Sequence, residues 1–76
     1  MQKLPMLSGL EAIKALARFG FYATRHRKGS HVVLCKESAE GAVLVVVPLH
    51  KELKTGTLRG IIRQAKISVD EFVSVL

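Results

Sequence analysis

The residues with the clearest chemical potential lie around a single histidine. His31 directly follows a basic, turn-forming segment that contains Arg25, Arg27, Lys28, Gly29 and Ser30. Histidine gains or loses a proton near neutral pH, and neighbouring cations can offset negative charge that develops on a phosphate. This group fits metal-independent cleavage of RNA by its own 2′-hydroxyl, which needs a base, an acid and cations. The alternative is a surface or hydrogen-bonded structural histidine, and residue types alone do not decide between the two.

A second histidine, His26, is a candidate partner for His31. A turn at Lys28-Gly29 would pair residues 27 and 30, so that His26 faces His31 across a hairpin. Directly opposed Cβ atoms lie roughly 4.5–5.5 Å apart, which suits a base and an acid that act together. Because a shift of one residue in register would separate the two side chains, this hypothesis depends on the position of the turn.

A second basic stretch lies between residues 50 and 66. Thr57 has a hydroxyl suited to begin a helix, and amide groups at a helix start can bind phosphate, although an ordinary helix cap is an equal alternative. His50 closely follows the third predicted strand, where capping of the strand end or lining of the site is a more common role than proton transfer. The candidate RNA-binding or supporting residues of this stretch are His50, Lys54, Thr57 and Arg59.

The composition favours a folded domain with a polyanionic partner. Twelve Lys and Arg against six Asp and Glu give the 76 residues a formal charge of +6, and 49% of the residues are hydrophobic. A charged face that only serves solubility is the alternative to nucleic-acid binding. One cysteine excludes an intramolecular disulfide, and three histidines with one cysteine are poor material for a zinc site, so we expect no metal and no cofactor. The longest apolar run, Ala42–Leu49, is far shorter than the ~20 residues of a membrane span, so we expect one cytoplasmic domain over residues 1–76 without membrane contact.

The spacing of apolar and turn residues predicts an α+β domain of the order α-β-β-β-α, a three-stranded antiparallel sheet with helices on one face and a short C-terminal helix. The expected elements are a helix over Gly9–Phe19, strands over Phe21–Arg27, Ser30–Lys36 and Ala42–Pro48, a helix from Thr57 and a short helix after Ser68. Capping boxes of Ser8 with Glu11 and of Ser68 with Glu71 are expected to begin the first and the last helix, and Gly20 suits the left-handed position that ends the first. The third strand is apolar on both faces, so either it is central and partly covered on both sides or a partner covers its open face. Gly60 predicts close packing inside the second helix, because glycine there costs up to about 1 kcal/mol relative to alanine.

Short motifs over nearly the whole chain resemble the HicA family of toxins, small ribonucleases of bacterial toxin–antitoxin systems. The matching pieces are Lys3-Leu4-Pro5, Gly20-Phe21, Arg25, Gly29-Ser30-His31, Val47-Pro48 with His50, and Gly56-Thr57-Leu58 with Ile61 and Ile62. The resemblance implies a double-stranded-RNA-binding-like fold, mRNA cleavage, a catalytic histidine at position 31 and neutralisation by a HicB-type antitoxin protein. Two positions depart from the family pattern: His26 is an additional histidine, and Lys66 stands where the family commonly has glycine.

Three functions from different classes follow. The favoured one is an endoribonuclease toxin (an mRNA interferase) of a type II toxin–antitoxin system, which uses His31 and inhibits translation and growth. The main alternative is a non-catalytic double-stranded-RNA-binding module, for which the basic second helix and the element order suffice. A protein-interaction module is the third, suggested by the two-faced third strand. The first and third are compatible if an antitoxin covers both the sheet and the active site.

Overall fold

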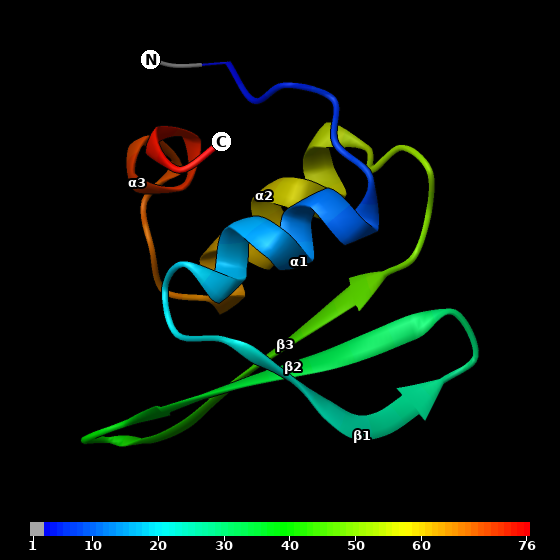
Figure 1. Ribbon diagram of the computed structural model, residues 1–76. Helices are drawn as coiled ribbons and strands as arrows, with labels where there is room; N and C mark the ends of the chain where they lie inside the picture. Colours follow the sequence, from blue (N-terminus) through cyan, green and yellow to red (C-terminus); the bar gives the residue numbers. More distant parts are fainter. Residues whose placement is uncertain (1–2) are drawn as a thin grey trace.

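Three helices cover one face of a three-stranded antiparallel sheet (Figure 1). The computed structural model describes residues 3–76, apart from the side chain of Arg27. In chain order the elements are α1 (Gly9–Ala17), β1 (Tyr22–Lys28), β2 (His31–Ser38), β3 (Gly41–Pro48), α2 (Thr55–Gln64) and α3 (Val69–Ser74). The α+β class, the element order and the one-sided helical layer are therefore as predicted. No helix in the described part of the chain is long and apolar enough to cross a membrane.

Local caps explain where α1 begins and ends. The Ser8 hydroxyl accepts a hydrogen bond from the Glu11 amide (3.1 Å), and the Glu11 carboxylate accepts one from the Ser8 amide (3.0 Å), which is the predicted capping box. These bonds favour the ionised carboxylate and lower the pKa of Glu11. After the helix, Gly20 takes a φ of +94° and the Phe21 amide donates to the Leu16 carbonyl, so the chain reverses toward β1.

The first hairpin turns one residue later than predicted. The register pairs Lys28 with His31, so the turn consists of Gly29 and Ser30 and not of Lys28 and Gly29. Gly29 has a φ of +61°, and a tight hairpin turn of this type places glycine at its first central position. The predicted turn and the observed turn both contain Gly29, but only the observed turn has it at the first central position. A bulge between Ala23 and Arg27 further changes the register of β1.

The most apolar strand, β3, lies at an edge of the sheet, because the strand order is β1-β2-β3. Of the two alternatives for this strand, the central position is therefore excluded. Its Val45 and Val47 side chains are fully buried under the helices, while Leu44 and Val46 are 58% and 42% exposed on the opposite face. The face opposite the helices is therefore open and apolar, as the second alternative requires, and that a partner covers it stays a prediction.

The second helix begins earlier than predicted, with Lys54 and not Thr57 at its N-cap. Leu53 is buried, and its amide donates to the Leu7 carbonyl (2.7 Å), so the chain is already fixed against the core just before the helix. Thr57 consequently lies inside the first turn. An added Cβ on Gly60 would meet nothing within 4 Å, so the expectation of close packing there is also wrong.

The end of α2 repeats the end of α1 with lysine in place of glycine. Lys66 has a φ of +61°, its amide donates to the Arg63 carbonyl, and the Ile67 amide donates to the Ile62 carbonyl. This is the hydrogen-bond pattern in which glycine is preferred, because a side chain in the left-handed region is strained.

We therefore expect Lys66→Gly to raise the free energy of unfolding by about 1 kcal/mol. Urea denaturation of the purified protein measures the change. Arg63→Gly, at an exposed position with ordinary helical geometry, is the matched control and should lower stability by about 1 kcal/mol. A loss of stability in both variants would contradict the strain at Lys66.

Candidate functional site

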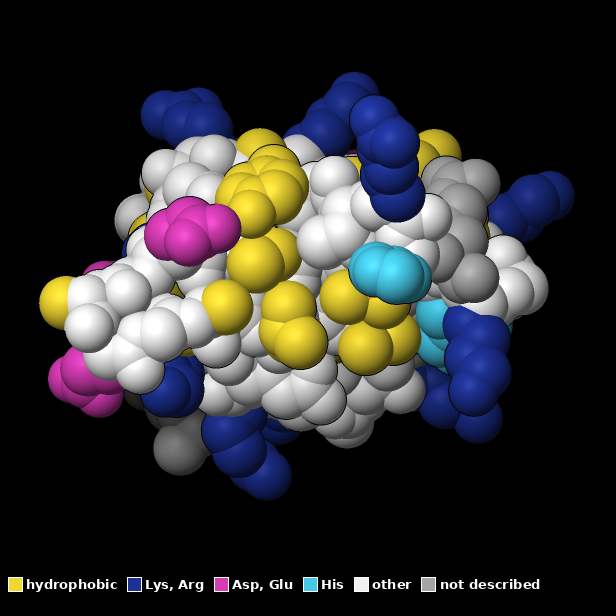
Figure 2. Space-filling model, turned by 90° about the horizontal axis from the view of Figure 1, so that it is seen from below, with side chains coloured by type: hydrophobic (Ala, Val, Ile, Leu, Met, Phe, Trp, Pro, Cys, Tyr) yellow, Lys and Arg dark blue, Asp and Glu magenta, His cyan; other side chains and the backbone are white. Residues whose placement is uncertain are grey.

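The structure brings two histidines together at one end of the sheet. His31 is the first residue of β2 and pairs with Pro48, the last residue of β3. His50 follows two residues later, and its ring centroid lies 6.4 Å from that of His31, with an interplanar angle of 71°. Both side chains are exposed. Figure 2 shows histidine side chains beside lysine and arginine at the rim of the sheet face.

Backbone hydrogen bonds hold the segment that carries His50. The Leu49 amide donates to the Ser30 carbonyl (2.7 Å), which joins this segment to the hairpin turn. The Gly9 amide donates to the His50 carbonyl (2.9 Å), which joins it to the start of α1. His50 is therefore anchored on both sides, although its ring remains accessible.

In the observed register, His26 does not lie at its predicted position opposite His31. Lys28, and not His26, lies opposite His31 across the hairpin. His26 is exposed in the bulged part of β1, where its amide donates to the Thr24 hydroxyl (3.2 Å). The predicted pairing of His26 with His31 is wrong, because the turn lies one residue further along the chain, and the geometric reason for a catalytic His26 is lost.

The predicted RNA-binding or supporting side chains fall into two sets. Lys28 is exposed beside His31, and Arg25 is exposed in the bulged segment, whereas the Arg27 side chain lies outside the described part of the structure. The other set, exposed on α2 or at its start, consists of Lys54, Thr57 and Arg59. Gly29 and Ser30 form the turn that ends β1, so they place Lys28 and His31 side by side.

The open face of the sheet is apolar and continuous with the histidines. Register places Tyr22, Cys35 and Leu44 in one row across the three strands, and Val33 and Val46 in the next row toward His31. Figure 2 shows this apolar strip along the middle of the face. The Tyr22 hydroxyl donates to the Glu37 carboxylate (3.0 Å), and contact with the Cys35 thiol and with this carboxylate raises the pKa of Tyr22 to about 12.

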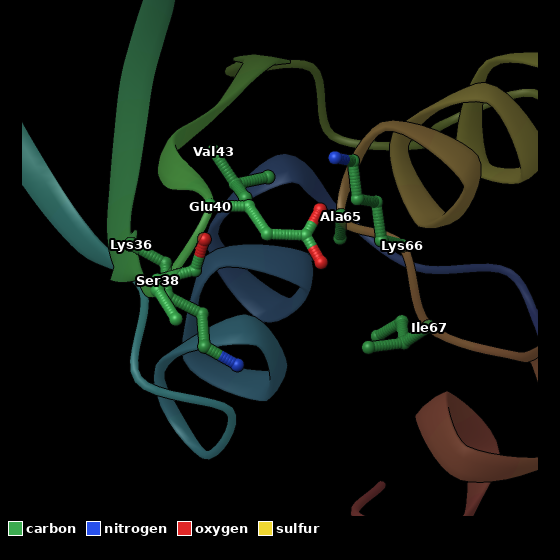
Figure 3. Close-up of a pocket in the computed structure, with 8 residues that line it drawn as sticks. Lys36, Ser38, Glu40, Val43, Ala65, Lys66 and Ile67 are labelled. Atoms are coloured by element: carbon green, nitrogen blue, oxygen red, sulfur yellow. The ribbon is translucent and has the colours of Figure 1, made fainter.

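The structure also has a hollow, which is separate from the histidine pair. It measures about 260 Å³ and lies between the β2–β3 turn and the end of α2. In Figure 3 the side chains of Glu40 and Lys66 extend along it from opposite sides. No histidine lines it. Within residues 3–76 as described, no cluster of three or more His, Cys, Asp and Glu has the geometry to hold a metal ion.

Sequence reasoning named His50 as a supporting residue but did not place it beside His31. The missing information was the register of β2 with β3. The predicted strands end at Lys36 and begin at Ala42, whereas the observed strands continue to a two-residue turn with Ser38 opposite Gly41. The position of Pro48 was the signal in the sequence that could have placed His50. A proline that ends a strand and is closely followed by a histidine places that histidine near the first residue of the antiparallel neighbouring strand.

The fold and the site together indicate the class of domain to which the protein belongs. An α-β-β-β-α domain with all helices on one face has the architecture of double-stranded-RNA-binding-like domains, and here it carries two exposed imidazoles at a basic end. A family model described as the HicA toxin of bacterial toxin–antitoxin systems matches residues 9–67. The chain belongs to the HicA toxin family and is a toxin of this kind of system. A comparison with curated proteins found no match.

Proposed function

We propose that the protein is an endoribonuclease that cleaves mRNA by metal-independent general acid–base catalysis with His31, and so inhibits translation and growth. The observation that carries the proposal is the exposed His31 imidazole at the basic hairpin end, with Lys28 opposite it, in a chain of the HicA toxin family. The alternative of a binding module without catalysis accounts for the basic surface but gives no role to an exposed imidazole beside a lysine.

The chemistry requires few groups. An imidazole accepts the 2′-hydroxyl proton while the 2′ oxygen attacks phosphorus, and a lysine ammonium or arginine guanidinium offsets the negative charge that builds on the phosphate oxygens. Lys28 is the described cation nearest to this position in the strand register. We propose that Arg25, Arg27, Lys54, Thr57 and Arg59, with Gly29 and Ser30 of the turn, bind or orient the RNA backbone. No cofactor takes part in this reaction.

The direct test is incubation of the purified protein with mRNA in the presence of EDTA. The proposed mechanism gives fragments that end in a 2′,3′-cyclic phosphate and begin with a 5′-hydroxyl. Fragments with these ends support the proposal. Binding of RNA without cleavage, measured on the same preparation by gel shift, would favour the double-stranded-RNA-binding module instead.

We also propose that a HicB-type antitoxin covers the open sheet face together with His31. Both sheet edges are poorly suited to accept a further strand. The Val46 amide on the outer side of β3 donates to the Gln64 side chain (3.3 Å), Pro48 two residues later has no amide hydrogen, and β1 is bulged. The exposed apolar side chains Tyr22, Leu44 and Val46 lie instead on the face, in rows that lead to the histidine.

Charge introduced into this face should separate antitoxin binding from cleavage. We expect Leu44→Asp combined with Val46→Asp to weaken the complex with the antitoxin encoded beside the toxin by about 100-fold, because buried apolar side chains at the centre of an interface contribute most of its affinity. Cleavage of mRNA by the free variant should persist. Leu10→Asp, at an equally exposed leucine on α1, is the control. Unchanged affinity in the double variant would show that the antitoxin binds elsewhere.

A further inference from the structure

We propose that His50 is the second proton carrier of the cleavage reaction and works on the opposite side of the phosphate from His31. This inference rests on the proposed ribonuclease function. It starts from a pair of ionisable rings that the fold holds close together, with centroids 6.4 Å apart and an angle of 71° between the ring planes. Neither ring is buried, so a phosphodiester can approach both.

The spacing of the rings fits a shared substrate. A group that moves a proton must come within about 2.6–3.2 Å of the oxygen that gains or loses it. The two ring centroids lie 6.4 Å apart and both side chains are exposed, so rotation of the side chains allows both rings to approach oxygens of one bound phosphodiester. The predicted partner, His26, lacks this relation, because Lys28 takes the position opposite His31.

The backbone holds His50 in place independently of its ring. Its carbonyl accepts the Gly9 amide, and the preceding Leu49 amide donates to Ser30, the residue directly before His31. The two histidines are thus connected through a short hydrogen-bonded path and not through a flexible loop. The charged neighbours of the pair are Lys28 opposite His31, and Lys51 and Glu52, which follow His50 in the chain.

The reaction balances with two imidazoles. One ring, as neutral imidazole, takes the 2′-hydroxyl proton as the bond from the 2′ oxygen to phosphorus forms, and the other, as imidazolium, gives its proton to the 5′ oxygen as the bond from that oxygen to phosphorus breaks. The products are a 2′,3′-cyclic phosphate and a 5′-hydroxyl, with no oxidation or reduction. Exchange of protons with water then restores both rings.

The test is the pH dependence of kcat/KM for RNA cleavage in the full-length protein. A base and an acid together give a bell-shaped profile, and we expect His50→Ala and His50→Gln to lose one limb of it, with a rate loss of roughly 10²–10⁴-fold. The limb that disappears shows which proton His50 moves. An RNA with sulfur in place of the leaving 5′ oxygen needs no acid, so it restores the rate of the His50 variants if His50 is the acid.

Lys51→Ala, next to His50 in the chain, is the matched control and should keep both limbs. Profiles of the two His50 variants that keep both limbs would overturn the inference, even with a reduced rate, because a merely structural role lowers the rate without removing a titrating group. His31→Ala is expected to lose cleavage whether or not His50 takes part. His50 variants that keep both limbs would therefore overturn only the role of His50, and the proposed function would stand. A wild-type protein that does not cleave RNA would overturn both.

Discussion

Replacement of His31 by alanine is expected to lower the rate of mRNA cleavage roughly 10²–10⁴-fold, the usual contribution of a positioned general acid or base. RNA affinity and melting temperature should remain close to those of the wild type. The reason is that the ring is exposed at the start of β2, so its removal leaves no cavity in the core. The cations Lys28 and Arg25, which hold the RNA backbone in the proposed site, remain in place. Cleavage, gel shift and thermal unfolding of the same preparation measure the three properties.

The matched control for this experiment is His26→Ala. His26 is also an exposed histidine of the first hairpin, but it lies in the bulged part of β1 and not opposite His31. We expect it to keep nearly full activity and an unchanged pH profile. Equal cleavage by wild type and His31→Ala would refute the catalytic role of His31. A simultaneous loss of RNA binding and cleavage would instead indicate that His31 holds the substrate and does not move its protons.

The accuracy of the sequence-based prediction depended on how local each feature is. The two capping boxes, Ser8 with Glu11 and Ser68 with Glu71, involve residues three apart and were identified correctly. The left-handed end of α1 at Gly20 was also predicted correctly, and Lys66 has a positive φ at the position where the family commonly has glycine. In each case the hydrogen bonds that determine the conformation lie within one turn of chain.

Register and sheet order were less accessible because they depend on contacts between segments. Gly29 fits either of two turn frames when only the hairpin sequence is considered, and the wrong frame paired His31 with His26. The continuous apolar run of β3 is compatible with a central strand and with an edge strand that has an open face. The strand order β1-β2-β3 decides between them, and that order depends on which strands pair across the sheet.

Sequence proximity therefore predicted which residues of the hairpin lie together, but not the contact between segments distant in the chain. His31, Lys28 and the Gly29–Ser30 turn are adjacent in sequence, so their proximity needed only a hairpin. His50 is 19 residues further along, and its approach to His31 requires the complete β2–β3 ladder with His31 opposite Pro48. The Thr57 hydroxyl was assigned to a cap that Lys54 occupies, because burial of Leu53 starts the helix earlier.

The largest effect on stability is expected from Gly9→Ala at the start of α1. An ideal Cβ at Gly9 would overlap the carbonyl oxygen of Pro48 and come within 3.0 Å of the Leu49 Cα, and these are backbone atoms that cannot rotate away. Either α1 or the end of β3 must move. We expect a loss of about 1–3 kcal/mol in the free energy of unfolding, as for other overpacked buried positions, which corresponds to a drop in Tm of at least roughly 4 °C.

Gly60→Ala is the matched control, because Gly60 is also a helical glycine but has open space around its Cβ position. Alanine favours the helix there by up to about 1 kcal/mol, so the same substitution should stabilise one helix and destabilise the other. Urea denaturation of both variants measures the difference. Two changes of the same sign would contradict the packing of α1 against the end of β3.

The variant Gly9→Ala also tests how the site is held, because the Gly9 amide donates to the His50 carbonyl. A shift of this contact displaces the His50 segment, and small displacements of reacting groups lower rates strongly. Under conditions where Gly9→Ala is fully folded, mRNA cleavage should therefore fall while RNA affinity persists, and Gly60→Ala should retain both.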